Sequence, residues 1–368
     1  MTALRMTAAG SLRIVWPVSA EFASLIRAAA WPEPRSVPDG GGPFVAATIR
    51  VVGPNPAVDR IEILDRLHVD AVNRSVEVLT RAGGKSLNLA RAIRRLGLEV
   101  SVYGFLGGWT GAFIRDACAA HGLTDRHTAI AGDTRISLVL AEPATGVSTV
   151  INEPGPLVTA PEAAGLLDTL SADYRAGDIA VLSGSLARGL PVDFHAEMVR
   201  RGQAVGARVI VDTSGPALAA AVEARPFMVK PNLAEFAHLT GRELHSDRPE
   251  EVLAEMRALV DAGVETVLVT LGEHGLLYAD AERMLRVHSP RVTAKNPTGA
   301  GDILLAGFVA ARAVGADAAT ALRIGVSAAA ASCARIEPDI DGPADALALL
   351  PEALVEAADA VRPGTGGP

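Results

Sequence analysis

The chain has few aromatic residues, and this shortage limits how its core can be built. Aromatic side chains make up only 4% of the 368 residues, whereas hydrophobic residues make up 49%. The interior must therefore consist mainly of Ala, Val, Leu and Ile. A chain with so many apolar residues is not disordered throughout. Its length is sufficient for one large α/β domain or two average ones.

The chain also lacks the patterns that mark disulfide, metal, nucleic-acid and membrane proteins. Its two cysteines, Cys118 and Cys333, lie far apart, and no Cys-x-x-Cys motif or Cys/His cluster with metal-ligand spacing is present. We therefore expect a reduced, cytoplasmic protein. The formal net charge is -8 and no long Lys/Arg run occurs, so we expect neither nucleic acid nor an anionic membrane surface as a partner. No apolar run approaches the roughly 20 residues of a membrane span.

The two ends of the chain differ from the rest. Residues 31–43 are rich in Pro and Gly, which favour neither a helix nor an inner strand. We expect residues 1–46 to form a mobile extension, residues 47–362 to form the folded domain, and residues 363–368 to be a frayed tail.

From Ala47 onward, short β-branched runs alternate with Ala/Leu-rich stretches of helical period. Strands are expected at residues 47–53, 100–107, 179–185, 208–213, 227–232 and 266–272. Helices are expected at residues 86–96, 110–121, 192–205, 217–223 and 250–262. This alternation predicts an α/β fold with a mostly parallel sheet. Ligands of such sheets bind at the carboxyl ends of the strands.

Two segments interrupt this rhythm, at residues 59–81 and 134–153. Each has the alternating pattern of two strands joined by a turn, so together they predict a small antiparallel β lid inserted into the domain. Its apolar positions are Ile61, Ile63, Leu67, Val76 and Val78. An exposed apolar sheet face invites a partner, and we expect a homodimer formed through the lids.

The strongest motif is Asn296-Pro-Thr-Gly-Ala-Gly-Asp302, which precedes a small and apolar helical run. Backbone N–H groups of Gly299, Ala300 and Gly301, together with the helix N-terminus, can form a site for an anion such as a phosphoryl group. Asp302 would lie beside it as a general base. The alternative is that Asp302 only caps the helix. The motif is neither a Walker A loop nor a Gly-x-Gly-x-x-Gly fingerprint.

A second Gly-rich motif, Arg81-Ala-Gly-Gly-Lys-Ser-Leu-Asn88, opens an expected helix. Its glycines allow a ligand to approach the backbone, and Lys85 and Asn88 can bind hydroxyls or phosphate oxygens. A plain Gly-rich turn between a strand and a helix would have the same pattern.

The third motif, Lys230-Pro-Asn-Leu-Ala-Glu235, follows an expected strand. Asn232 and Glu235 would share one face of a helical turn, where their oxygens suit Mg²⁺ held partly through water. The alternative is a helix N-cap with a reciprocal Glu, and the motif alone favours that alternative.

In their order along residues 48–350, these motifs resemble those of the ribokinase/PfkB family of sugar kinases. Segments 54–59, 183–186 and 270–275 also fall where that family has site segments. The chain is most similar to the phosphosugar branch, which contains the 1-phosphofructokinases and tagatose-6-phosphate kinases. The segments that carry this likeness are GPNPAVDR, VNR at 72–74, GGK, GFLGG at 104–108, TRIS at 134–137 and INEPGP at 151–156.

The resemblance implies a ribokinase-like three-layer sandwich with a β lid. It implies transfer of the γ-phosphoryl group of ATP, with Mg²⁺, to a free primary hydroxyl of a hexose monophosphate. Fructose 1-phosphate is preferred over tagatose 6-phosphate or fructose 6-phosphate. A kinase of an unphosphorylated sugar is disfavoured because two cationic groups, Lys85 and Arg135, would stay unpaired, and a sensor without catalysis is disfavoured by the intact motifs.

The resemblance also implies a role for each matching residue. Asp302 would be the base, with the amides of Gly299, Ala300 and Gly301 as an anion hole. Lys85 and Arg135 would bind the phosphate already on the sugar. The residues implied to contact the rest of the sugar are Asp59, Gly84, Asn88 and Ser185. Those implied for the nucleotide and Mg²⁺ are Lys230, Asn232, Glu235, Thr270, Gly272 and Gly275.

The chain departs from the family pattern at a few positions. Ser86 replaces the usual Gly after the Gly-Gly-Lys sequence, and Ala187 and Arg188 stand where Pro is usual. Ile303 follows Asp302 where a small polar residue is common. None of these changes removes a group that the chemistry requires, so they bear on the identity of the substrate more than on activity.

Overall fold

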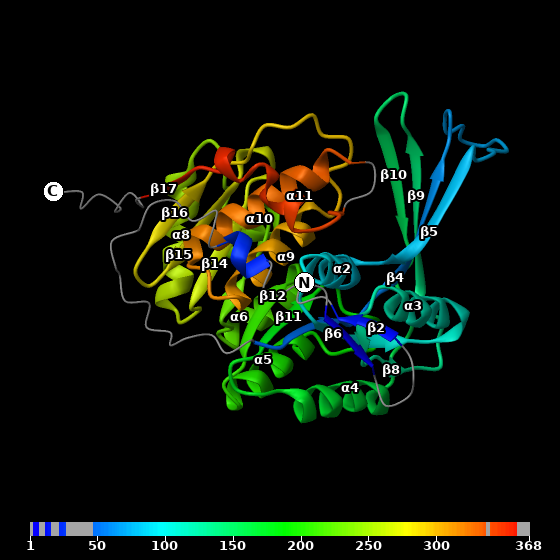
Figure 1. Cartoon of the computed structure of the whole chain (residues 1–368), viewed down its shortest axis with the longest axis horizontal. Coiled ribbons are helices and arrows are strands. Elements are labelled where there is room, and N and C mark those ends of the chain that lie inside the picture. Colours follow the sequence, from blue (N-terminus) through cyan, green and yellow to red (C-terminus); the bar gives the residue numbers. More distant parts are fainter. Residues whose placement is uncertain (1–2, 7–11, 16–21, 27–46, 336–338, 359–368) are drawn as a thin grey trace.

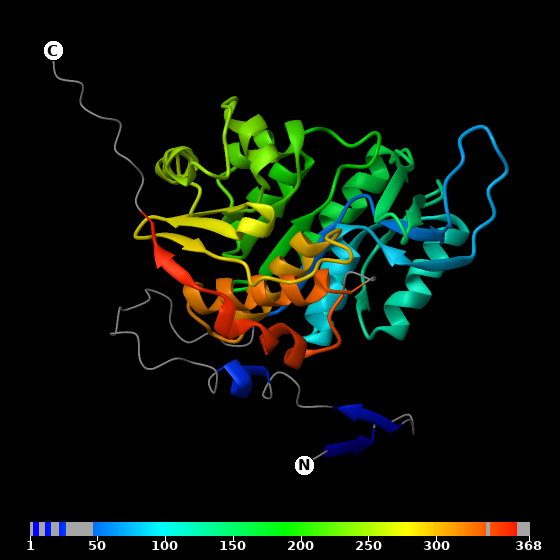
Figure 2. The ribbon, with the colours of Figure 1, turned by 90° about the horizontal axis from the view of Figure 1, so that it is seen from above.

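The computed structural model describes residues 3–6, 12–15, 22–26, 47–335 and 339–358. Most of the expected extension over residues 1–46 and all of the expected tail over residues 363–368 lie outside these ranges. In the described part of the extension, β1 (Ala3–Met6) pairs with β2 (Leu12–Val15). Farther along, Phe22 and Ile26 of the short helix over residues 22–26 are buried in the core of the domain, beside the orange and red helices of Figure 2.

The described residues form one large sheet of 11 strands with a parallel centre. Six parallel strands are β6 (Val100–Leu106), β3 (Ile49–Gly53), β11 (Ile179–Ser183), β12 (Arg208–Asp212), β13 (Met228–Val229) and β14 (Thr266–Thr270). Beyond β14 the sheet continues antiparallel with β15 (Leu276–Asp280), β16 (Met284–Val287) and β17 (Val355–Ala357). The short strands β7 (Thr124–Asp125) and β8 (Thr128–Ala129) run parallel to β6.

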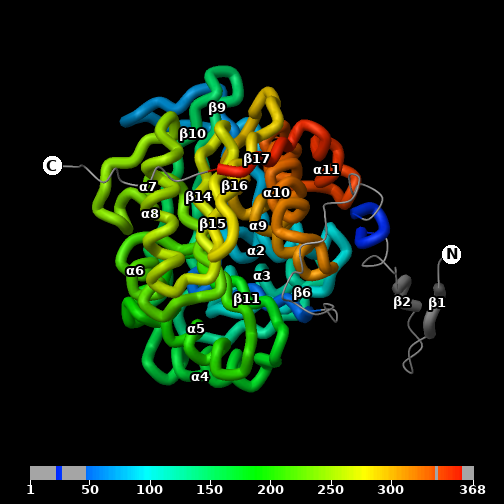
Figure 3. Tube along the Cα trace, turned by 90° about the vertical axis from the view of Figure 1, so that its left-hand side faces the viewer, coloured from blue at the N-terminus to red at the C-terminus, as the bar shows by residue number. Residues whose placement is uncertain are grey.

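Helices cover both faces of this sheet, as Figure 3 shows. One layer contains α2 (Lys85–Arg95), α3 (Gly108–Ala120), α9 (Ala300–Ala313), α10 (Ala318–Cys333) and α11 (Pro343–Ala348). The other contains α4 (Ala160–Asp173), α5 (Phe194–Ala204), α6 (Gly215–Glu223), α7 (Leu233–Thr240) and α8 (Pro249–Asp261). Neighbouring strand residues point to opposite faces, so Val51 joins one core and Val52 the other. The three-layer α/β sandwich expected from the sequence is confirmed.

Several helices were not predicted from the sequence, and each omission has a physical reason. Helix α10 is built mostly of small residues and is buried along much of its circumference, so it shows no clear amphipathic period. Helix α7 is only eight residues long and begins inside the Lys-Pro-Asn motif. Helix α4 begins with a capping box between Thr159 and Glu162. A capping box marks a helix start, but it does not contribute to the apolar periodicity from which the helices were predicted.

The lid is a separate sheet of four strands that projects from the body of the molecule (Figure 1). Its strands are β4 (Ala57–Ile63), β5 (Glu77–Gly83), β9 (Arg135–Glu142) and β10 (Val147–Asn152). The two hairpins β4–β5 and β9–β10 are antiparallel, as expected, whereas the central pair β4–β9 is parallel. Between β5 and β9 the chain contributes β6, β7 and β8 to the main sheet. This long connection allows β9 to run parallel to β4.

Strand register sorts the lid residues into two faces. Arg81, Asp59, Ser137 and Asn152 form one cross-strand row, and Leu79, Ile61, Val139 and Val150 form the next row on the same face. The polar row therefore lies at the base of the lid and the apolar row farther out. Val78 pairs with Glu62 and lies on the opposite face. Among the described residues, no helix is long and apolar enough to cross a membrane.

Candidate active site

The motifs converge at the carboxyl ends of the central strands. Strands β11, β12 and β13 are parallel neighbours, so the residues that follow them lie side by side. Strand β11 ends at Ser183 and is followed by Gly184 and Ser185, Asp212 ends β12, and Lys230 comes directly after β13. Helix α9 starts at the same edge, and α2 packs against it.

Asp302 is directed into this edge and does not cap its own helix. The N-cap position of α9 is Gly299, with φ of 80°, and no side chain caps the helix. Only 5% of Asp302 is exposed, and its Oδ2 accepts a hydrogen bond of 3.2 Å from Nδ2 of Asn88 on α2. The capping interpretation of Asp302 therefore does not describe this structure.

A second carboxylate, Asp212, lies fully buried between two lysines. Its Oδ1 is 3.2 Å from Nζ of Lys85, and its Oδ2 is 3.3 Å from Nζ of Lys230. Burial works against the charged form of Asp212, but the two lysines outweigh it and lower the pKa of the carboxyl. The two lysine amines are thereby held at the edge of the site.

These charges set the protonation of Asp302. Burial is the largest effect and raises its pKa, and the negative charge of Asp212 raises it further. Lys85, Lys230 and the hydrogen bond from Asn88 act in the opposite direction, and the resulting pKa is about 7. A carboxyl group with this pKa can accept a proton near neutral pH.

The N-cap residue and the first turn of α9 contain the three expected backbone donors, and two of them can still donate. The N–H of Ala300 already donates to the carbonyl of Pro297 at 3.2 Å. Among the described residues, no acceptor takes the N–H of Gly299 or Gly301. A Cβ placed on Gly301 would lie 3.6 Å from Nζ of Lys230, so a cation stands next to these amides.

The second Gly-rich motif brings the base of the lid to the site. A Cβ on Gly83 would overlap the carboxylate of Asp59, so only glycine allows this close approach. The N–H of Gly84 donates to Asp59. Burial raises the pKa of Asp59, and the charges of nearby arginines, Arg81 first, work against this shift.

The unusual Ser86 is accommodated by another glycine. Ser86 is buried, and its side chain occupies the space that a Cβ of Gly53 would need at the end of β3. Its hydroxyl therefore packs against the main sheet while still lining the edge of a cavity. The replacement of Gly by Ser at this position leaves the turn intact.

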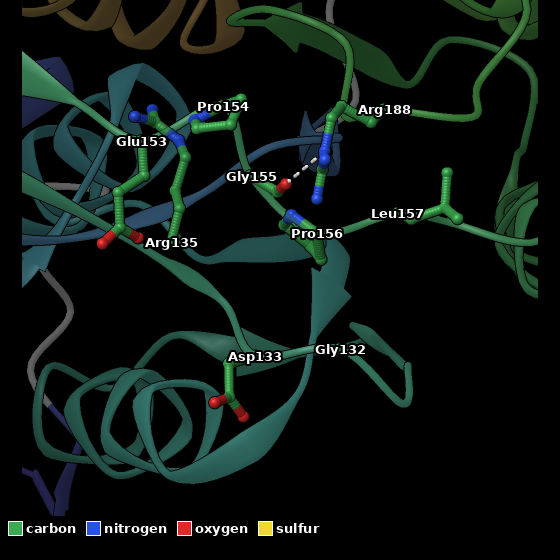
Figure 4. A pocket seen from close by; sticks show the side chains of 9 residues that line it. All are labelled: Gly132, Asp133, Arg135, Glu153, Pro154, Gly155, Pro156, Leu157 and Arg188. Atoms are coloured by element: carbon green, nitrogen blue, oxygen red, sulfur yellow. Dashed lines mark hydrogen bonds between the residues drawn. The ribbon is translucent and has the colours of Figure 1, made fainter.

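Two cavities meet at Arg135. The inner one measures about 200 Å³ and is lined by Asn55, Lys85, Ser86, Arg135, Ser183, Gly184, Ser185, Thr213, Ser214 and Glu235. The outer one measures about 320 Å³ and is lined by the residues of Figure 4. Lys85 thus lies in the inner cavity, next to Asp212, and not in the outer one. Arg135 borders both cavities.

Arg188 is a residue of the outer cavity whose role the sequence did not reveal. Its Nε donates to the carbonyl of Gly155 at 2.9 Å. Figure 4 shows the guanidinium groups of Arg188 and Arg135 on opposite sides of the segment at Pro154 and Gly155. The only signal in the sequence was the departure from the family pattern after Ser-Gly-Ser-Leu, which indicated a changed loop but no ligand.

The residues expected at the nucleotide lie together at the ends of β13 and β14. Asn232 and Thr270 form a parallel bridge, and a Cβ on Gly272 would meet open space. A Cβ on Gly275 would overlap the carbonyl oxygen of Val287. This position therefore requires glycine for a structural reason, besides the nucleotide contact expected from the sequence.

The pair Asn232 and Glu235 forms the reciprocal N-cap that the motif alone favoured. Each side chain accepts the backbone N–H of the other at 2.9 Å. Glu235 nevertheless lines the inner cavity. The described residues include no cluster of three or more His, Cys, Asp or Glu suited to a metal. The oxygens of Asn232 and Glu235 fit Mg²⁺, because this ion keeps most of its waters and binds substrate phosphates.

Comparison with known proteins shows what the chain resembles. The model of the pfkB family of carbohydrate kinases matches residues 51–344. A 1-phosphofructokinase of Xanthomonas campestris is 37% identical over 312 residues, which cover 83% of this chain and 95% of that protein. A 1-phosphofructokinase of Bacillus subtilis is 33% identical over 278 residues, or 76% of this chain and 90% of that protein. The crystal structure of phosphofructokinase-2 from Escherichia coli in complex with potassium has a TM-score of 0.79 at 27% identity and covers 84% of this chain and 99% of that one.

The charge arrangement predicts how Asp302 responds to a change at Asp212. In Asp212→Asn, the pKa of Asp302 should fall from about 7 by about one unit or more, because a negative neighbour is lost while Lys85 and Lys230 remain. Titration of ¹³C-labelled Asp carboxyls by NMR measures this shift, with Asp302→Asn assigning the signal. Asp178→Asn removes a buried carboxylate that pairs with Arg50 and should leave Asp302 unchanged. A pKa of Asp302 that stays or rises in Asp212→Asn would contradict this account.

Proposed function

Because the chain belongs to the pfkB family of carbohydrate kinases, we propose that it transfers the γ-phosphoryl group of ATP to the free primary hydroxyl of fructose 1-phosphate, giving fructose 1,6-bisphosphate. The two relatives that share 37% and 33% of their residues with it are 1-phosphofructokinases. The observation that carries the chemistry is the buried Asp302, whose pKa is about 7. We also propose a cytoplasmic setting, in keeping with the free cysteines Cys118 and Cys333.

In this proposal Asp302 takes the proton of the sugar hydroxyl as its oxygen attacks the γ-phosphorus. A new bond forms between the sugar oxygen and the phosphorus, and the bond from the phosphorus to the β–γ bridging oxygen breaks, so ADP leaves with that electron pair. Asn88 holds Asp302 by one N–H and retains a second N–H for the sugar. Asp59 and the backbone of Gly84 would contact the other hydroxyls. Phosphoryl transfer needs this positioning more than covalent help from the protein.

Positive charge surrounds the place where the phosphoryl group would move. Lys85 and Lys230 stand on either side of Asp212, and the N–H groups of Gly299 and Gly301 have no acceptor among the described residues. In a buried site such preorganised donors stabilise the charge of the transition state. Mg²⁺, when bound, would neutralise charge on the ATP phosphates, and Glu235 would hold it through water.

The outer cavity provides a place for the phosphate that the sugar already carries. A sugar with its acceptor hydroxyl at Asp302 would extend past Arg135 toward Arg188, which border the same cavity. Each of these guanidinium groups is a suitable donor to phosphate oxygens. An unphosphorylated sugar would leave both without an anionic ligand, which disfavours a kinase of that kind. Tagatose 6-phosphate and fructose 6-phosphate stay as alternative substrates, since they differ in where the first phosphate sits.

Replacement of the base tests the proposed function directly. Asp302→Asn should reduce kcat with fructose 1-phosphate by about 10²- to 10⁴-fold, because the amide cannot accept the proton. The assay couples ADP release to a readout across fructose 1-phosphate, fructose 6-phosphate, tagatose 6-phosphate and fructose. Turnover of fructose 1-phosphate with the highest kcat/KM is expected. Tight binding of a sugar phosphate without any turnover would instead identify a sensor.

Replacement of Arg188 tests the phosphate end of the site. Arg188→Ala should raise the KM for fructose 1-phosphate by about tenfold and leave kcat nearly unchanged, because the contact is made in the ground state and the transition state alike. Arg242→Ala, which removes an exposed arginine paired with Glu255, serves as the control. An unchanged KM in Arg188→Ala would remove this residue from the phosphate site.

We further propose that the protein forms a homodimer through the lids. The apolar row of Leu79, Ile61, Val139 and Val150 lies on the same face as the polar row at the lid base. Val150 is 48% exposed in the single chain, and a second copy would cover it. The row begins directly beyond Asp59, so the dimer would also enclose the sugar end of the site.

A charge placed in this row should separate the dimer. Val150→Glu should give the mass of a monomer by light scattering coupled to gel filtration, because a buried carboxylate without a partner opposes association. Val147→Glu on the same strand points to the opposite face and should leave the dimer intact. A native protein with the mass of a monomer, or a Val150→Glu protein with the mass of a dimer, would contradict the proposed interface.

A further inference from the structure

A buried chain of polar side chains leads from the proposed base through helix α2 to the C-terminal part of the protein. Asp302 accepts from Nδ2 of Asn88 at 3.2 Å. Oδ1 of Asn88 accepts from a terminal nitrogen of Arg91 at 3.0 Å. Nε of Arg91 donates to Asp339 at 2.6 Å. We propose that Arg91, held by Asp339, is a positioning residue that fixes the amide of Asn88 so that its N–H, and not its carbonyl oxygen, faces Asp302.

The carboxamide of Asn88 could be placed in two orientations. The two ends of a carboxamide have nearly the same shape, so packing alone does not choose between its two orientations. A guanidinium group only donates hydrogen bonds. The end of Asn88 that faces Arg91 must therefore be the oxygen, and the end that faces Asp302 must be the NH₂ group.

Arg91 can impose this choice because it is itself immobilised. Besides its bonds to Asn88 and Asp339, it donates to the backbone carbonyl of Ala82 at 3.1 Å. Both Arg91 and Asp339 are 5% exposed. Asp339 is fixed from a further side by Arg95, whose terminal nitrogen lies 3.0 Å from its Oδ2. The guanidinium group thus has a defined partner on each of its edges.

The consequence concerns the proton on Asp302. An N–H that donates to a carboxyl group stabilises the ionised form, whereas a carbonyl oxygen in the same place would accept from the protonated form and stabilise that one. Arg91 therefore favours the form of Asp302 that can act as a base. This inference rests on the proposed function for its catalytic meaning, but the coupling between Arg91 and Asp302 is measurable without turnover.

Other charges near these groups must stay constant in the test. Lys85, Lys230 and Asp212 face Asp302 directly, and the charge of Arg91 also acts on Asp59 and His121. The substitution Arg91→Lys keeps the positive charge but removes the fork that serves three acceptors. It therefore changes the hydrogen-bond geometry with little change in the field.

The experiment titrates ¹³C-labelled Asp carboxyls of the full chain without ligands by NMR, with Asp302→Asn assigning the signal. In Arg91→Lys the pKa of Asp302 should rise by about one unit, because the amide of Asn88 is free to turn. The acidic limb of the pH profile of kcat should move in the same direction by the same amount. Arg94→Lys, on the same helix but with Nε of Arg94 directed at the carbonyl of Gly122, is the matched control and should leave both unchanged.

An unchanged pKa of Asp302 in a folded Arg91→Lys protein would overturn the inference and leave Arg91 a purely structural residue. If that protein does not fold, Asp339→Asn is titrated in its place. It loosens Arg91 without removing it, so a smaller rise is expected and no rise overturns the inference. Full turnover in Asp302→Asn would refute the proposed base, yet the titration would still decide whether Arg91 sets its pKa.

Discussion

The site depends on the burial of two carboxylates, Asp212 and Asp302, beside two lysines. A buried charge is costly unless it is paired, and Asp212 is paired on both sides by Lys85 and Lys230. The pKa of Asp302 is raised by burial and by the negative charge of Asp212, and it is lowered by the positive charges of the two lysines. The balance leaves a carboxyl group that exchanges its proton near neutral pH. The same pairing holds the two lysine amines at this edge of the sheet.

The fold brings these groups together from distant parts of the chain. Parallel strands place Asp212 and Lys230 at one edge of the sheet, and the packing of α2 on α9 adds Asn88 to Asp302. The lid contributes Asp59 and Arg135 from paired strands. Each group is anchored by regular structure, which suits a reaction that relies on positioning. The lid extends from the body of the molecule (Figure 1).

Much of this arrangement could be predicted from the sequence because local motifs carry it. The turn that ends in Asp302 needs glycine and small residues to present backbone amides, and the sequence Gly299-Ala-Gly-Asp302 contains them. The role of Asp212 could not be predicted, because Asp212 ends an ordinary apolar strand and belongs to no motif. Asp339 lies in a loop without a pattern, and its bond to Arg91 joins segments far apart in the chain. Arg188 was visible only as a departure from the family, since its orientation depends on the carbonyl of Gly155.

By itself the sequence determined the α/β class, the lid segments and the Gly-rich turn before Asp302, because periodicity and glycine placement act over a few residues. Only the tertiary structure decided that β4 and β9 pair in parallel, that Lys85 lies against Asp212 and that Asn88 presents its N–H to Asp302. These features depend on which distant side chains share a buried space. Charges and hydrogen bonds in such a space act over a few ångströms, and no local pattern of residues encodes that proximity.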